Sequence, residues 1–253
     1  MPSFTMKVFR GDPSGGDFRE YRVDSDEGMV VLDVIHRIQA TQANDLACRW
    51  NCKAGKCGSC SAEINGNPRL MCMTRMNLFE PGATITVAPI RTFPLVKDLV
   101  TDVSFNYVKA KQVPPLRMKP PGPDGKYRMW QEDIDRIQEF HKCIECFLCQ
   151  DVCHVIRDHP LEPAFSGPRF FIKIAGLDMH PLDSVDRTEF AQQRAGIGLC
   201  NITKCCTEVC PEHIHITDNG IIPMKERAAD NMDPVVWLLR KFRGQGQGQK
   251  RPA

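Results

Sequence analysis

The stretch CIECFLCQDVCH, residues 143–154, carries four cysteines spaced C-x2-C-x2-C-x3-C. In ferredoxins that hold two iron–sulfur clusters, the first three cysteines of such a run bind one cluster and the fourth binds the other. The usual run ends in Cys-Pro, whereas His154 follows Cys153 here. The spacing therefore predicts two neighbouring clusters, with an unusual residue beside the second of them.

A second run, CNITKCCTEVCP at residues 200–211, supplies the remaining ligands. The same template places ligands at positions 200, 203, 206 and 210, but position 203 is a threonine. The four thiolates of an expected [4Fe–4S] cluster are Cys143, Cys146, Cys149 and Cys210. The three thiolates left for the other cluster are Cys153, Cys200 and Cys206. A cubane that lacks one cysteine readily lacks the corresponding iron, so this second cluster is expected to be [3Fe–4S].

Cys205 lies in this run but outside the template. It could in principle supply a fourth ligand and convert the three-thiolate site to [4Fe–4S]. Adjacent residues rarely direct their side chains at the same small target, and Cys206 is already a predicted ligand. We therefore interpret Cys205 as a free thiol packed nearby.

An earlier cysteine group lies in NCKAGKCGSC, residues 51–60, and has the spacing C-x4-C-x2-C typical of plant-type [2Fe–2S] proteins. The four predicted ligands are Cys52, Cys57, Cys60 and Cys72. Thiolate charge offsets the ferric irons, and Gly55 and Gly58 give the loop the freedom to wrap around a small cluster. Zinc ligands usually come as two C-x2-C pairs, which this spacing fits poorly. Cys48 is left over and is interpreted as a small buried hydrophobe.

The composition favours metal chemistry for the 13 cysteines. The first 27 residues have no apolar signal core and several acids, so they resemble neither a secretory signal nor a transit peptide. A reducing compartment is therefore expected, where a disulfide framework is rare. With 33 basic and 31 acidic residues, the charge gives no argument for nucleic acid as a partner. No apolar run approaches the roughly 18 residues of a membrane span, so the chain is expected to be soluble or peripheral.

Hydrophobic periodicity predicts an α+β protein, with a β-grasp [2Fe–2S] ferredoxin domain over residues 1–105. Phe4, Met6 and Val8 alternate as in a strand, GDPSGGD is a turn, and residues 31–38 follow helical spacing. SAEINGNPRL predicts a strand and a turn, and ATITVAPI (83–90) predicts a last strand.

An all-α ferredoxin domain is expected over residues 106–245, followed by a flexible tail at 246–253. The proline- and lysine-rich stretch 108–127 is the strongest linker signal. WQEDIDRIQEF, RFFIKIAGLDM and DPVVWLLRKF are predicted helices. They are expected to wrap around the buried [4Fe–4S] and [3Fe–4S] clusters.

This arrangement resembles the iron–sulfur subunits of succinate dehydrogenase and fumarate reductase, which are succinate:quinone oxidoreductases. Eleven cysteines on the family's pattern carry the resemblance, and LACRWNCKAGKCGSC and FHKCIECFLC also look like the family's. The likeness covers residues 4–225.

The resemblance implies an electron-transfer subunit with no substrate chemistry of its own. Its partners would be a flavoprotein with covalent FAD, which oxidises succinate, and a membrane anchor. Electrons would pass through [2Fe–2S], [4Fe–4S] and [3Fe–4S] to quinone, near the last cluster or reached through the anchor. The expected place is the cytoplasmic face of a bacterial inner membrane, as a peripheral protein held by the anchor.

The residues beside the last cluster depart from the family. Many members have a proline directly after the first [3Fe–4S] ligand, a tryptophan a few residues on, and a histidine after the second ligand. This chain has His154, Asp158 and Asn201 at those places. The residues that form the family's usual quinone pocket therefore cannot be assigned in this chain.

Three alternatives to a succinate dehydrogenase subunit remain open. The first is fumarate reduction, because cluster potentials that the sequence does not give set the direction. The second is a subunit of another flavoprotein dehydrogenase, which the [2Fe–2S] domain disfavours. The third is a redox sensor, for which the sequence offers no partner-binding segment.

Overall fold

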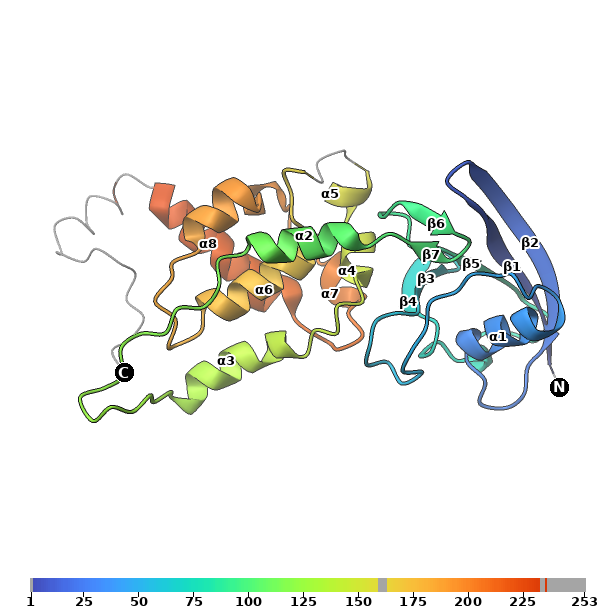
Figure 1. Cartoon of the computed structure of the whole chain (residues 1–253), viewed down its shortest axis with the longest axis horizontal. Coiled ribbons are helices and arrows are strands. Elements are labelled where there is room, and N and C mark those ends of the chain that lie inside the picture. The colour runs from blue at the N-terminus through green and yellow to red at the C-terminus, as the bar shows by residue number, and fades with distance from the viewer. Residues whose placement is uncertain (1, 159–162, 233–234, 236–253) are drawn as a thin grey trace. The chain divides into compact units, whose positions relative to one another are not determined.

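The computed structural model describes residues 2–158, 163–232 and 235 of the 253-residue chain (Figure 1). Contacts divide the chain into two compact units. The first unit comprises Met1–Phe105, Ile144–Val152 and Val209–Glu212. The second unit comprises Asn106–Cys143, Cys153–Glu208 and His213–Ala253. Two short cysteine-bearing segments thus belong with the N-terminal part, and the residue boundaries of the predicted domains stay predictions.

The first unit is built on a five-stranded sheet with the order β2-β1-β5-β3-β4. The strands are β1 (Ser3–Asp12), β2 (Gly15–Asp24), β3 (Ser61–Ile64), β4 (Asn67–Leu70) and β5 (Thr84–Ala88). β1 pairs with β5 in parallel, and the other neighbours are antiparallel. The smaller elements are α1 (Val31–Thr41), η1 (Met76–Leu78), β6 (Leu95–Lys97) and β7 (Val100–Thr101).

One apolar core joins the sheet to α1. Met6 and Val8 point inward from β1, and Ile35 and Ile38 of α1 are equally inaccessible to solvent. These are the residues whose periodicity predicts a strand and a helix, so both predictions are confirmed. The predicted strands at 61–70 and 83–90 are also confirmed. The mixed sheet packed against one helix agrees with the predicted β-grasp.

The predicted turn GDPSGGD is shorter than expected, because the strands β1 and β2 continue through its glycines. Gly11 pairs with Gly16 and Asp12 pairs with Gly15, which leaves only residues 13–14 as the turn. A Cβ atom on Gly11 would lie 2.5 Å from the Gly15 carbonyl oxygen, so the strands approach closely here because these residues are glycines.

The second unit consists of short helices. Its elements are α3 (Gln131–His141), α5 (His154–Arg157), α6 (Pro168–Asp178), the π-helix η2 (Phe190–Arg194), η3 (Ile197–Leu199), α7 (Cys205–Glu208), the π-helix η4 (Ile216–Ile221) and α8 (Ile222–Met232). The helix α2 (Ser104–Gln112) contains the division between the units, and α4 (Leu148–Asp151) belongs to the first. The helices predicted at 130–140 and 169–179 are confirmed as α3 and α6. The predicted helix DPVVWLLRKF lies, apart from residue 235, outside the described residues, and the tail 246–253 lies wholly outside them.

The core of the second unit forms around α6, which packs against α3 and η4. Phe170, Phe171 and Ile174 of α6 are buried. Phe140 of α3 lies over Gly176, where an added Cβ atom would be 3.4 Å from the Phe140 Cβ atom. Such a distance is an ordinary van der Waals contact, and α3 leads directly into the cysteine run.

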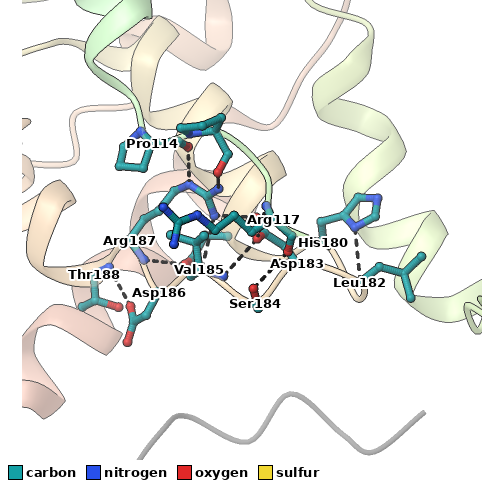
Figure 2. A network of polar contacts seen from close by, with 12 residues as sticks. Pro114, Arg117, His180, Leu182, Asp183, Ser184, Val185, Asp186, Arg187 and Thr188 are labelled. Carbon is teal, nitrogen blue, oxygen red and sulfur yellow. Dashed lines mark hydrogen bonds and ion pairs between the residues drawn. The ribbon is translucent and has the colours of Figure 1, made fainter. Parts of the chain in front are cut away.

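A buried arginine holds the proline-rich stretch against this unit (Figure 2). Arg187 is wholly inaccessible, and its Nη1 atom donates to Asp183 Oδ2 at 2.6 Å. Its other donors reach the carbonyl oxygens of Pro114 and Pro115, at 2.9 and 2.8 Å. The Arg117 N–H in turn donates to Asp183 Oδ1 at 3.2 Å. The part of the predicted linker around residues 114–117 is therefore pinned along the second unit.

Candidate metal centres

The loop that carries Cys52 wraps around the sulfur of that residue. The backbone N–H groups of Ala54 and Lys56 both donate to Cys52 Sγ at 3.3 Å. Lys53 and Gly55, each directly before one of these two donors, have positive φ, at 56° and 67°, which turns the N–H groups inward. Such N–H groups stabilise negative charge on sulfur, as the ligands of an iron–sulfur cluster require.

The other three cysteines of the predicted [2Fe–2S] site lie in contact with this loop. Cys57 is hydrogen-bonded to Cys52, and Cys60 interacts with both Cys57 and Cys72. The Cys72 N–H donates to Cys60 Sγ at 3.5 Å. Cys60 and Cys72 are buried, with 3% and 6% of their surface exposed. The structure thus gathers the four cysteines of this group at one place in the first unit.

The thiols of this group differ in acidity. Burial raises the pKa of Cys60 to about 12. Burial also acts to raise the pKa of Cys57, but hydrogen bonds from Ser59 and from the loop around Cys52 outweigh it and lower this pKa to about 6. Because metals bind thiolates, cluster assembly here releases protons, chiefly from the buried thiols.

The loop of Cys146 and Cys149 packs against the first cysteine loop within the same unit. Both cysteines are buried. The Ser61 hydroxyl lies 2.8 Å from the Cys146 carbonyl oxygen and 3.0 Å from the Gly58 carbonyl oxygen. A Cβ atom on Gly58 would lie 2.6 Å from Cys146 Cα, so the two backbones are in direct contact.

The remaining predicted ligands of the [4Fe–4S] site are divided between the units. Cys210 belongs to the first unit, where the Lys56 ammonium lies 3.1 Å from Oε1 of nearby Glu212. Cys143 belongs to the second unit. The complete set of four ligands for this cluster therefore stays a prediction.

A small pocket in the second unit is lined by the cysteines predicted to hold the last cluster. Cys153, Cys200 and Cys206 all line it, and so does Cys205. Burial raises the pKa of Cys153 and of Cys206 to about 11. The structure therefore brings the three predicted ligands to the wall of one pocket.

The loop between Cys200 and Cys206 turns twice through left-handed backbone. Ile202 and Lys204 have φ of 62° and 65°, and such a φ is a genuine outlier for a β-branched isoleucine. Thr203, at the position where the template has a cysteine, lies between them. Strained backbone of this kind persists only where the surroundings enforce it, and it clusters at functional sites.

Polar groups beside the predicted cysteine ligands complete the pocket. Thr203 Oγ1 lies 3.3 Å from Cys205 Sγ and 3.5 Å from His154 Nδ1. Thr217 Oγ1 lies 3.5 Å from Cys206 Sγ. The Nε2 atom of His154 is buried and has no hydrogen-bond partner among the described residues. Sequence reasoning missed Thr217, because no spacing rule connects it to the cysteine run.

The residues present fit iron–sulfur clusters, because backbone N–H groups point at sulfur in the first loop and thiols line a small pocket in the second unit. The 13 cysteines are thiols and form no disulfides. Within the described ranges, no three histidine, cysteine or acidic residues are grouped so as to hold a single metal ion. In the part of the chain that the structure describes, no helix is long and apolar enough to cross a membrane.

Comparison with known families defines the class of protein. Residues 5–107 match the family described as a 2Fe-2S iron-sulfur cluster binding domain. Residues 139–214 match the family described as a 4Fe-4S dicluster domain. Fold and sites together define an electron-transfer protein with a [2Fe–2S] domain followed by a helical dicluster domain, which confirms the predicted fold class.

Similar proteins then give the particular family. A chain of the solved structure titled "Mycobacterium smegmatis Sdh1 complex in the apo form" is 64% identical with a TM-score of 0.89, covering 92% of this chain and 99% of that one. The fumarate reductase iron-sulfur subunit of Mycobacterium tuberculosis is 32% identical, covering 85% of this chain and 88% of that protein. A mitochondrial succinate dehydrogenase iron-sulfur subunit of Oryza sativa is 28% identical, covering 83% and 77%. This chain belongs to the iron–sulfur subunits of the succinate dehydrogenase and fumarate reductase family, and the predicted resemblance is confirmed.

Proposed function

We propose that this chain carries single electrons from a succinate-oxidising flavoprotein subunit to quinone, through [2Fe–2S], [4Fe–4S] and [3Fe–4S] clusters in that order. When bound, the clusters supply sites that accept and release one electron each. The chain's own residues hold the thiolates, bury them and set the distances between them.

The contact between the two cysteine loops of the first unit carries this proposal. The loop with Gly58 touches the loop with Cys146 backbone to backbone, so loops that carry proposed ligands of the first two clusters adjoin within one compact unit. Cys149 and Cys153, proposed ligands of the second and third clusters, are only four residues apart along the chain. Short separations of this kind are what single-electron transfer along a series of sites needs.

We assign each cluster the ligands that the spacing predicts. The [2Fe–2S] ligands are Cys52, Cys57, Cys60 and Cys72. The [4Fe–4S] ligands are Cys143, Cys146, Cys149 and Cys210. The [3Fe–4S] ligands are Cys153, Cys200 and Cys206. Metal and acid-labile sulfide analysis of the anaerobically purified protein is expected to give about nine irons per chain (2 + 4 + 3), and finding zinc instead would contradict the assignment.

Succinate oxidation is the direction that we favour. Support comes from the similarity to the chain of the Sdh1 complex, at 64% identity, against 32% for the fumarate reductase subunit. Fumarate reduction is the alternative. Rates of quinone reduction by succinate and of fumarate reduction by quinol, measured on the same purified complex, distinguish the two.

The proposed partners are a flavoprotein subunit with covalent FAD and a membrane anchor that holds the chain at the cytoplasmic face of a bacterial inner membrane. A relative of 64% identity within a complex supports an assembly of several subunits. Quinone would lie near the third cluster or be reached through the anchor. His154 and Asn201 line the third pocket, whereas the exposed Asp158 is not among its lining residues.

The identity of the third cluster is tested by replacing Thr203. The oxidised complex is expected to give a [3Fe–4S] signal in electron paramagnetic resonance, and Thr203→Cys is expected to remove most of it by allowing a fourth iron to bind. Thr203→Ser keeps a hydroxyl at the same place and should keep the signal. Absence of the signal from the unmodified protein would contradict the three-iron assignment.

A further inference from the structure

Four thiols, rather than three, line the pocket in the second unit. Cys205 and Cys206 are the first two residues of α7, and both are part of the pocket wall. Ile202 and Lys204, in the loop that precedes α7, have left-handed backbone and line the same pocket. Two adjacent cysteines thus line the same pocket.

We propose that Cys205 binds a fourth iron in this pocket, so that the site holds either a three-iron cluster on three cysteines or a four-iron cluster on all four. The proposal rests on the proposed assignment of Cys153, Cys200 and Cys206 as the other ligands. In a cubane each thiolate binds a different iron, so the four cysteines of the pocket wall can bind one cluster without their sulfurs converging on one point.

Cys205 is a better ligand for this iron than the other polar groups nearby. Thr203 occupies the template position but offers only a neutral hydroxyl, and iron in sulfur clusters prefers thiolate. The same hydroxyl lies 3.3 Å from Cys205 Sγ, where it can donate a hydrogen bond to the sulfur. Cys205 is half-buried, so ferrous iron from solution can reach it.

Gain and loss of the fourth iron, here called the exchange, balance in iron, protons and electrons. The starting state is the one-electron-reduced [3Fe–4S]⁰ cluster, which takes up one Fe²⁺. Cys205 forms an Fe–S bond to this iron, and its thiol proton passes to water. The product is [4Fe–4S]²⁺. In the reverse direction a one-electron oxidant such as ferricyanide removes one electron, Fe²⁺ leaves, Cys205 regains a proton and [3Fe–4S]⁺ remains. The reducing electron comes from succinate through the flavoprotein, or from dithionite in the test.

The consequence is a final electron carrier that responds to iron and oxidant. Cluster type is one of the factors that set the reduction potential of an iron–sulfur site. Gain or loss of one iron at Cys205 would therefore change how easily the last site passes its electron to quinone.

The test compares the unmodified complex with Cys205→Ser, and uses Cys48→Ser as a matched control. Cys48 is a half-buried thiol of the first unit, outside the three cysteine patterns. Each complex is reduced anaerobically with dithionite, titrated with Fe²⁺ and freed of excess iron. Iron per chain and the [3Fe–4S] paramagnetic signal after gentle reoxidation are then measured.

We expect the unmodified protein and Cys48→Ser to gain one iron per chain and lose most of the [3Fe–4S] signal. Cys205→Ser should need at least about tenfold more Fe²⁺ for the same change. If the unmodified protein already carries four irons at this site, Cys205→Ser should convert it to [3Fe–4S], which equally supports the proposal.

Two results would overturn it: no iron uptake by the unmodified three-iron protein, or equal uptake with and without Cys205. The [2Fe–2S] signal reports assembly of each variant, and Cys205→Ala provides a second substitution. If both substitutions remove the third cluster while the [2Fe–2S] signal persists, Cys205 is an obligatory ligand and the exchange is wrong. Failure of the proposed function would appear separately, as a [2Fe–2S] cluster in the unmodified complex that dithionite reduces and succinate does not.

Discussion

Replacing Arg187 with leucine should destabilise the second unit by about 3–5 kcal/mol, the usual cost of removing one partner of a buried ion pair. Arg187 and Asp183 are both wholly inaccessible to solvent. Leucine would leave the Asp183 carboxylate without its counter-charge, and the carbonyl oxygens of Pro114 and Pro115 without their donors.

The surroundings of Asp183 favour the ionised carboxylate in the folded protein. Burial acts to raise its pKa, but hydrogen bonds from the N–H groups of Val185 and Arg117, and then the Arg187 guanidinium, outweigh burial and hold the pKa below 3.8. Arg187→Leu removes the guanidinium from this balance and leaves burial, the largest opposing effect, in place. The buried carboxylate therefore loses the stabilisation that the native pair provides.

Hydrogen exchange in the full complex measures this effect. The Arg187 N–H donates to Asp178 at the end of α6, so amides of α6 should exchange faster by about two to three orders of magnitude. The control is Arg128→Leu, since Arg128 pairs with Asp124 at the same spacing of four residues but is 63% exposed. That variant should leave exchange almost unchanged. Equal, small effects in both variants would show that burial does not determine the strength of these pairs.

Short-range features of this fold can be predicted from the sequence. Cysteine spacing predicts three of the four ligands at each of two sites, because an iron–sulfur cluster takes several of its ligands from one tight loop and these lie close together in the sequence. The periodicity of Met6 and Val8, and of Ile35 and Ile38, gives the core in the same way, since one face of a short element is buried.

Long-range pairings are what the sequence does not reveal. Arg187 resembles any surface arginine in sequence, and its acceptors at Pro114 and Pro115 lie more than 70 residues away. A proline-rich stretch indicates a linker by composition, but buried donors elsewhere in the fold decide whether it is held. Left-handed backbone at Ile202 and Lys204, just before Cys205 and Cys206, is likewise not predicted by the propensities of these residue types.

Replacing Gly58 with alanine should disrupt two cluster sites at once. Gly58 has a φ of 66°, and a Cβ atom there would lie 2.6 Å from Cys146 Cα and 2.8 Å from Cys146 N. Both neighbours are backbone atoms in a buried loop, so the clash cannot be relieved by turning a side chain. We expect the variant to lose more than the about 1–2 kcal/mol that a left-handed alanine alone costs. The loop of Cys57 and the loop of Cys146 should move apart.

Gly66→Ala isolates this contact, because Gly66 has a φ of 75° but nothing within 4 Å of an added Cβ atom. Both variants carry the cost of left-handed backbone, and only Gly58→Ala carries the clash. Paramagnetic resonance should show altered [2Fe–2S] and [4Fe–4S] signals in Gly58→Ala and native signals in Gly66→Ala. Transfer of electrons from succinate past the first cluster should be slower only in Gly58→Ala. Native signals and native transfer in Gly58→Ala would mean that the backbone contact does not set the spacing of these two sites. The electron path would then depend on the cysteines alone.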